Sequence, residues 1–248
     1  MNSEAEEGAG PGYIPVPWIA ASCRDGGPGR EMRIPAVYPA NRLGVKVELF
    51  FDSVREMKVI DHWLAGARRV ESCNCDDRPD AGDMSLVVIH GISLPPGEFG
   101  GDWIECLFTN TLEPTAHPYF ESICGLRVSA HALIRRDGEI VQFVPFHRRA
   151  WHAGVSNYQG RERCNDFSIG IELEGADDAP YADVQYERLA DVLAALFAAY
   201  PGLSPDRVVG HSDIAPGRKT DPGPSFDWER LYRLLSIFDS PLPKGEGI

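Results

Sequence analysis

The sequence has no long apolar segment and no recognisable export signal. Its purely apolar runs, such as residues 86–89, fall far short of the roughly 20 residues that a membrane-spanning helix needs. The chain begins MNSEAEE, which has neither the basic start nor the apolar stretch of a secretory signal. We therefore expect no membrane partner and a location in the cytoplasm.

Positive charge and cysteine are both scarce. Lysine and arginine number 24 against 37 aspartates and glutamates, so the formal net charge is −13 at pH 7. A chain this acidic lacks the positive field that attracts nucleic acid, and we expect no nucleic-acid partner. The 6 cysteines are scattered through 248 residues, a length that needs no disulfide staples, so we expect them to be reduced.

Two short enzyme motifs are also missing. The helical metalloprotease signature His-Glu-x-x-His is absent. The glycine-rich residues 8–12 are followed by Tyr13 rather than by glycine, and no strand precedes them, which excludes a dinucleotide-binding loop. Residues 8–39 hold 6 glycines and 6 prolines, about twice the density of the whole chain, and this composition predicts an extended or disordered leader.

Beyond the leader, strand-like and helix-like patterns alternate. Residues 57–70 carry Ile60, Leu64 and Ala67 at helical spacing. The other expected elements are strands at 86–89, 126–134, 140–144, 167–173 and 207–209, and helices at 183–200 and 228–238. The dipeptide at 137–138 is typical of a tight hairpin turn. Interleaved strands and helices predict the α/β class, with a central mixed β-sheet flanked by helices.

Three residues are candidate ligands of a metal ion. His90 ends one expected strand, His211 follows another, and Asp221 lies in the polar loop after it. Two imidazoles and one carboxylate are the minimal protein set for a catalytic zinc, which keeps a position open for water. The residue types alone leave an alternative open, because each histidine could equally be a hydrogen-bonded residue of a loop or the core.

Long stretches of the chain resemble one family. They read HGISLPPGEFGG (90–101), LRVSAH (126–131), RAWHAGVS (149–156), QGRERCNDFSIGIELEG (159–175) and GHSDIAPGRKTDPGP (210–224). Through them, the chain from about Trp63 to the last expected helix resembles the AmpD-type branch of the amidase_2 family, the N-acetylmuramoyl-L-alanine amidases. The resemblance implies a T7-lysozyme-like fold. It also divides the chain into a leader or overlong start over residues 1–56 and a zinc amidase domain over residues 57–248.

The resemblance implies a catalytic set. It assigns Zn²⁺ to His90, His211 and Asp221, the role of general base to Glu172, and stabilisation of the reacting carbonyl to Lys219. Glu172 ends an apolar strand, an expensive place for a carboxylate without a function or a partner. The alternatives are an ion pair for Glu172 and a solvated surface position for Lys219.

The resemblance also implies substrate contacts. A muropeptide stem is anionic, so an acidic protein needs local cations, and Arg127 and Arg163 are the candidates; surface solubility is their alternative. Trp151 would stack on the sugar or fill the core. His152 would lie beside the metal or contact the substrate, whereas we expect His131 to be a packed, hydrogen-bonded residue inside a strand.

Two positions depart from the family pattern. Position 91, directly after the first expected ligand, is usually Asn but is Gly here, which puts one substrate hydrogen bond in doubt. Position 212 is Ser where Cys is common. Neither departure removes an expected ligand or the base.

The resemblance implies a zinc-dependent enzyme of cytoplasmic cell-wall recycling. It would cleave the amide bond between N-acetylmuramic acid, in its 1,6-anhydro form, and L-alanine of a small muropeptide, and we expect a monomer. One alternative is a non-catalytic peptidoglycan-binding or regulatory module of the same fold. Another is a periplasmic amidase that acts on intact peptidoglycan.

Overall fold

The computed structural model describes residues 20–21, 32–33 and 57–238. The chain divides into two compact units, Met1–Val54 and Arg55–Ile248. In the first unit, β1 (Ala20–Ala21) and β2 (Met32–Arg33) pair in antiparallel fashion. The predicted leader otherwise lies outside the described residues, so its character stays a prediction. Among the described residues, no helix is long and apolar enough to cross a membrane.

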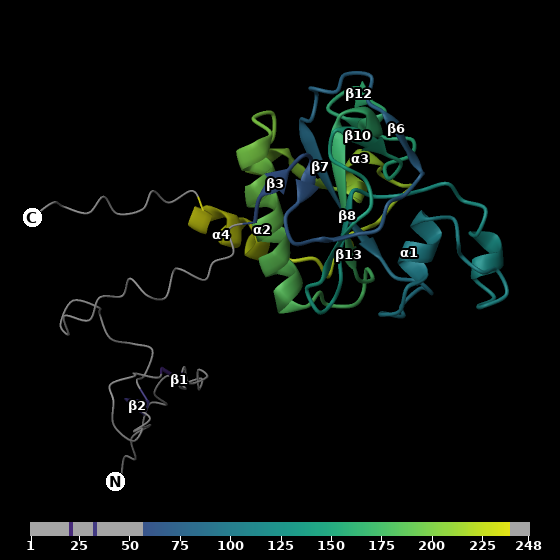
Figure 1. Ribbon diagram of the computed structural model, residues 1–248, viewed down its shortest axis with the longest axis horizontal. Helices are drawn as coiled ribbons and strands as arrows, with labels where there is room; N and C mark the ends of the chain where they lie inside the picture. The colour runs from purple at the N-terminus through teal and green to yellow at the C-terminus, as the bar shows by residue number, and fades with distance from the viewer. Residues whose placement is uncertain (1–19, 22–31, 34–56, 239–248) are drawn as a thin grey trace, which may run out of the picture. The chain divides into compact units, whose positions relative to one another are not determined.

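The second unit is built on one six-stranded sheet (Figure 1). Its strand order is β14-β7-β13-β8-β9-β5. The bounds are β14 (Val208–Gly210), β7 (Leu86–Ile92), β13 (Ser168–Glu174), β8 (Ala132–Ile134), β9 (Ile140–Gln142) and β5 (Arg68–Arg69). Only β8 and β9 pair in antiparallel fashion, and the other neighbours are parallel. The predicted central mixed sheet is therefore confirmed.

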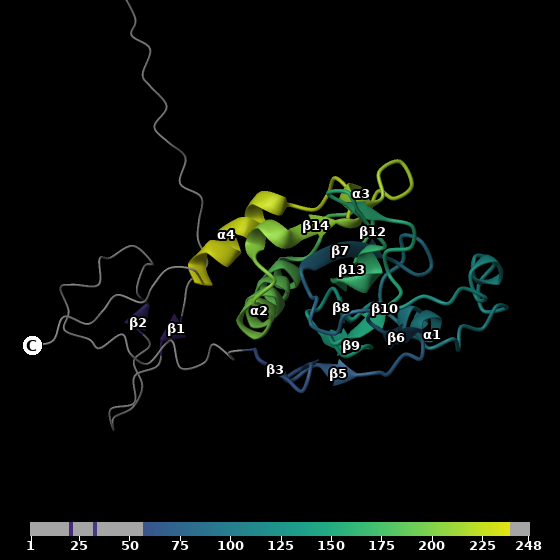
Figure 2. The same ribbon diagram turned by 90° about the horizontal axis from the view of Figure 1, so that it is seen from above.

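Helices cover the sheet on both sides. Figures 1 and 2 show α2 (Asp183–Ala199) and α4 (Trp228–Phe238) on one side and α1 (Trp103–Phe108) on the other. Both long helices lie where the apolar spacing of the sequence predicts them. The remaining elements are short: β6 (Cys75–Asp77), η3 (Phe120–Ser122), β10 (Arg148–Ala150), β11 (Asn157–Tyr158), β12 (Arg161–Glu162), η4 (Cys164–Asp166), η5 (Pro205–Arg207) and α3 (His211–Ile214).

Along β7 and β13, alternate side chains point to opposite faces of the sheet. Val87, Ile89, Ile169 and Ile171 belong to the apolar cluster that α2 and α4 complete. Because successive side chains of a strand point to opposite faces, His90 and Glu172 point to the other side of the sheet. The two are register partners across the parallel pair, so they lie next to each other.

The expected helix at residues 57–70 is wrong. This segment forms a hairpin of β3 (Val59–Ile60) and β4 (Trp63–Leu64), followed by β5. Its turn residues Asp61 and His62 have φ values of 49° and 68°, which suit a two-residue hairpin turn and not a helix. Ile60 is 56% exposed and Leu64 only 1%, so the helical spacing did not mark one buried face. The strand expected at 126–134 likewise begins only at Ala132.

Candidate metal centre

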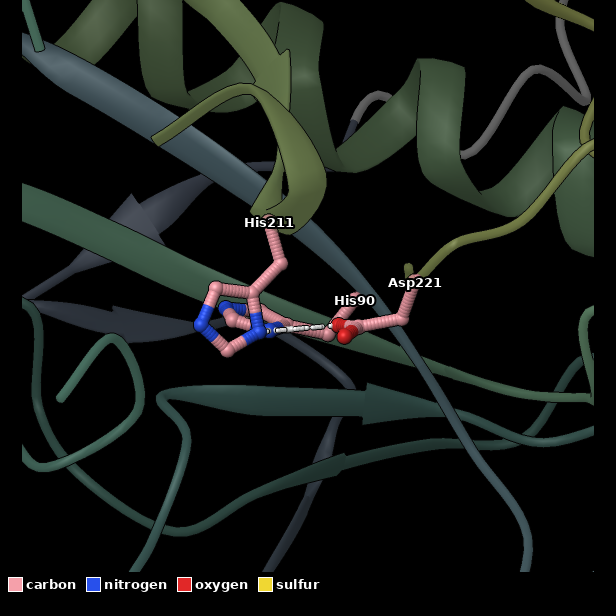
Figure 3. Close-up of side chains that lie close together, drawn as sticks. All are labelled: His90, His211 and Asp221. Atoms are coloured by element: carbon pink, nitrogen blue, oxygen red, sulfur yellow. Dashed lines mark hydrogen bonds and ion pairs between the residues drawn. The ribbon is translucent and has the colours of Figure 1, made fainter. Parts of the chain in front are cut away.

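Three candidate ligand atoms converge at the edge of the sheet where β7 and β14 end (Figure 3). The Nδ1 atoms of His90 and His211 lie 3.0 Å apart. Oδ2 of Asp221 lies 3.1 Å from Nδ1 of His90 and 3.0 Å from Nδ1 of His211. Both histidines are buried, and Asp221 is half-buried. The structure therefore brings together the three residues that the sequence singles out.

The parallel pairing of β7 and β14 explains this meeting. Val208, Val209 and Gly210 are register partners of Val87, Val88 and Ile89. His211 directly follows Gly210, and His90 directly follows Ile89, so the two histidines lie at the same end of neighbouring strands. The loop with Asp221 returns to this edge because the backbone N–H of Ser212 donates to the Asp221 carbonyl at 3.0 Å.

A chain of hydrogen bonds assigns the ring proton of His90. The Ser168 hydroxyl donates to the carbonyl of Cys164 at 2.6 Å, which leaves its oxygen free to accept from Nε2 of His152 at 3.2 Å. Nδ1 of His152 then accepts from Nε2 of His90, at 2.9 Å. With its proton on Nε2, His90 presents the lone pair of Nδ1 to the centre.

His211 has the same tautomer. Its Nε2 lies 3.2 Å from the carbonyl oxygen of Ala153, an atom that only accepts, so the ring proton is on Nε2. Two imidazole lone pairs and one carboxylate oxygen therefore meet at about 3 Å. Neither Nδ1 atom carries a proton, so no hydrogen bond joins the two nitrogens. This donor set fits Zn²⁺.

The charge states of the centre suit a cation. Burial lowers the pKa of His90 from 6.5 to about 4, so its imidazole is neutral near pH 7. Burial alone would raise the pKa of Asp221, yet this pKa lies well below its usual range, so the carboxyl group is ionised at neutral pH. A neutral imidazole and an ionised carboxylate are the forms that bind metal ions.

Glu172 is a buried carboxyl group next to the centre. It is 8% exposed, and its Oε2 atom has no hydrogen-bond partner among the described residues. Burial, and next the charge of Asp221, raise its pKa well above the usual value, while Lys219 opposes this shift. A carboxylate destabilised in this way gains a proton readily, which is the property of a general base.

A pocket of about 250 Å³ opens over the centre. Seven of the nine residues predicted for the site line it: His90, Trp151, His152, Glu172, His211, Lys219 and Asp221. Leucine, isoleucine and phenylalanine side chains supply apolar parts of the wall. Trp151 is half-buried and donates through Nε1 to Asp76 at 3.0 Å, so it is both a packed residue and a wall of the pocket.

The two predicted arginines lie outside this lining. Arg127 is exposed and donates to Oδ1 of Asn110 at 2.9 Å. Arg163 is exposed, pairs with Asp166 at 3.1 Å, and lines a separate surface hollow that also includes Arg218. The structure does not bring either guanidinium to the pocket over the centre.

His131 is a packed residue of the core, as the sequence predicts. It is fully buried, its Nδ1 accepts from the backbone N–H of Gly170 at 3.0 Å, and its Nε2 donates to the Arg148 carbonyl at 3.0 Å. Both ring nitrogens are therefore occupied by main-chain partners. Burial lowers its pKa to about 3.

Sequence reasoning missed the residues that seat His152. Ser168 accepts from its ring, and Gly170 makes room for it, because a Cβ at position 170 would lie 2.4 Å from Cγ of His152. The available signal was the alternation in β13, where these two small residues share a face with Glu172 while large apolar residues share the other.

The chain is similar to known amidases. Residues 80–224 match the Amidase_2 family, described as N-acetylmuramoyl-L-alanine amidase. It is 65% identical over 175 residues to the 1,6-anhydro-N-acetylmuramyl-L-alanine amidase AmpD of Salmonella typhimurium (strain SL1344), covering 71% of this chain and 93% of the relative. It is 65% identical over 174 residues to AmpD of Escherichia coli (strain K12), covering 70% and 94%. A crystal structure of a selenomethionine AmpD derivative superposes with a TM-score of 0.71 at 64% identity, covering 72% of this chain and 99% of that chain.

Proposed function

The chain belongs to the Amidase_2 family of N-acetylmuramoyl-L-alanine amidases, and on this basis we propose that it is a zinc hydrolase of anhydro-muropeptides. Its relatives are named 1,6-anhydro-N-acetylmuramyl-L-alanine amidases. By analogy, the bond cleaved would join the lactyl carbonyl of 1,6-anhydro-N-acetylmuramic acid to L-alanine of the stem peptide. The observation that carries the proposal is the convergence of two histidine nitrogens and a carboxylate oxygen beside the buried Glu172.

His90, His211 and Asp221 would hold the metal ion. The neutral form of His90, the ionised form of Asp221 and the lone pairs that hydrogen bonds of the two histidines direct inward support this assignment. When bound there, zinc would polarise the scissile carbonyl and make a nucleophilic water available at neutral pH. Chelation is therefore expected to abolish turnover, and full activity in metal-free protein would refute the zinc assignment.

Glu172 would move the proton of the reaction. Its carboxylate would accept a proton from the attacking water and deliver it to the nitrogen of the leaving alanine, so that neither water nor amine carries an unfavourable charge. Lys219 lines the same pocket and would stabilise the negative charge that grows on the carbonyl oxygen in the transition state.

The remaining predicted residues would orient the muropeptide. Trp151 and His152 line the pocket and would contact the part of the substrate near the scissile bond. Arg127 and Arg163 are exposed beyond the lining, so as substrate contacts they would meet the anionic part of the stem that projects from the pocket. A cytoplasmic location and a monomeric state stay predictions.

A product assay tests this proposal against its alternatives. The zinc-loaded protein is incubated with an anhydro-muropeptide and, separately, with polymeric peptidoglycan, and released L-alanyl peptides are quantified. We expect release from the anhydro-muropeptide. Binding without release would favour a non-catalytic module, and release only from the polymer would favour an amidase of the intact wall.

A further inference from the structure

One buried tyrosine beside the centre has no part in the reaction described above. Tyr181 lies between β13 and α2 and is 5% exposed. Its hydroxyl donates to the carbonyl oxygen of Pro222 at 2.9 Å. Pro222 directly follows Asp221, so this phenol holds the main chain next to the carboxylate of the centre.

The same hydroxyl fills the space of a side chain at position 91. Gly91 directly follows His90, and it is one of the two departures from the family pattern. A Cβ added there would lie 2.2 Å from the Tyr181 hydroxyl oxygen, but 3.5 Å from Cζ of the ring and 3.5 Å from Cα of Pro222. The phenolic oxygen alone is therefore incompatible with a side chain at this position.

The ring of Tyr181 is held on its other sides as well. A Cβ at Gly175 would lie 2.2 Å from Cε1 of the ring, so a second glycine forms the slot. Tyr186 and Phe226 contact the ring edge-on, with centroids 6.4 Å and 5.5 Å away. Burial, and next the nearby Glu172, raise the pKa of Tyr181, so its hydroxyl stays a proton donor.

Two links therefore fix Asp221 beside the histidines. The carbonyl of Asp221 accepts from the backbone of Ser212, directly after the second histidine. Tyr181 makes a second link, towards the first histidine, because its hydroxyl donates to Pro222, directly after Asp221, and fills the space beside Gly91, directly after His90. We propose that Tyr181 is a positioning residue, whose hydroxyl sets the place of Asp221 relative to His90. This inference rests on the proposed function, because it takes the cluster to be a metal site.

The test removes one oxygen atom. Tyr181→Phe keeps the ring in its slot and deletes the hydrogen bond to Pro222. We expect its affinity for Zn²⁺, measured by competition with a chromophoric chelator, to fall about tenfold, the scale seen when groups that orient metal ligands are altered. The wild-type chain binding zinc in the same assay is the reference.

Tyr200→Phe is the matched control. Tyr200 is 7% exposed, and its hydroxyl bonds to Nδ1 of His62 at 2.9 Å, in a hydrogen bond that involves none of the three ligand residues. Each variant loses one tyrosine hydrogen bond, buried for Tyr181 and partly buried for Tyr200, and is expected to lower the Tm of the metal-free protein by a few degrees. Only Tyr181→Phe is expected to weaken zinc binding, which a merely structural role would not do.

A second pair of variants tests the contact with position 91. Gly91→Ala is expected to weaken zinc binding in the Tyr181 background, because the new methyl displaces the hydroxyl. In the Tyr181→Phe background the same substitution is expected to add little, since the nearest remaining atoms lie at 3.5 Å. If either single variant fails to fold, the zinc affinity of the other one still tests the proposal, because each is expected to weaken zinc binding by itself.

Three outcomes would overturn the inference. They are wild-type zinc affinity in Tyr181→Phe, an equal loss in Tyr200→Phe, and equal effects of Gly91→Ala in both backgrounds. Each would leave the proposed function intact, because the wild-type chain would still bind zinc. Absence of zinc binding by the wild-type chain would instead refute the metal centre itself, together with this inference.

Discussion

At the scale of single residues, the proton chemistry depends on one carboxyl group. Glu172→Gln removes the base without touching a ligand, so we expect kcat to fall by about 10²- to 10⁴-fold while zinc affinity stays near wild type. Steady-state kinetics and chelator competition measure the two quantities. Glu174→Gln, a buried carboxyl group on the same face of β13 outside the pocket lining, should keep kcat within a few-fold. A near-normal kcat in Glu172→Gln would assign the base elsewhere.

Another residue acts through His152. Ser168→Ala removes the oxygen that accepts from Nε2 of His152. The His152 tautomer whose Nδ1 accepts a hydrogen bond from His90 is then no longer fixed. We expect zinc affinity to fall about tenfold. Ser129→Ala also deletes a buried hydroxyl, one that donates to Asn74, and should leave zinc affinity unchanged. Equal affinities for the two variants would contradict this link.

At the scale of elements, the close packing of His152 on β13 makes a steric prediction. Gly170→Ala places a methyl 2.4 Å from Cγ of His152, so the ring must shift, which disturbs its hydrogen bond with His90. We expect a loss of about 1–3 kcal/mol in the free energy of unfolding, together with weaker zinc binding. Gly125→Ala is the control, because a Cβ there meets no atom within 4 Å. Chemical denaturation and chelator competition are the measurements.

The elements also show what a sequence can predict. The two long helices follow from leucine spacing, and β7 and β13 follow from apolar runs, because burial on one or both faces dictates these patterns. The segment 57–70 misled because its turn depends on backbone angles at Asp61 and His62, which apolar spacing does not encode. The convergence of His90 and His211 was foreseeable from strand ends. The places of Ser168 and Tyr181 depend on side-chain packing that the sequence alone leaves undetermined.

At the scale of the whole molecule, buried histidines make the free energy of unfolding of the metal-free protein depend on pH. The pKa of His131 is about 3 and that of His90 about 4, both below the ordinary 6.5. The unfolded chain therefore takes up these protons first. The stabilising contribution is complete above about pH 6.5 and is lost as the pH falls towards 3 to 4. We expect the free energy of unfolding, from denaturant titrations, to decline across this window.

His131→Gln tests how much His131 contributes to this decline in the free energy of unfolding. The variant lacks the titrating ring, so the slope of unfolding free energy against pH between 6.5 and 3 should shrink by up to one proton. Its lower overall stability does not affect this comparison, because only the slope is used. A slope equal to that of the wild type would show that His131 titrates alike in the folded and unfolded chain.

The edge position of β14 has a consequence for the order in which the domain opens. Within the described part of the chain, this three-residue strand pairs with β7 alone, and it leads directly into His211. A metal ion held by both His90 and His211 would link β14 to β7 and raise the free energy of local opening of β14. Amide hydrogen exchange at Val208 and Val209 should therefore slow on addition of zinc more than exchange in β9 at the far side of the sheet. The metal ion of the reaction would then also stabilise the edge strand β14 against local unfolding.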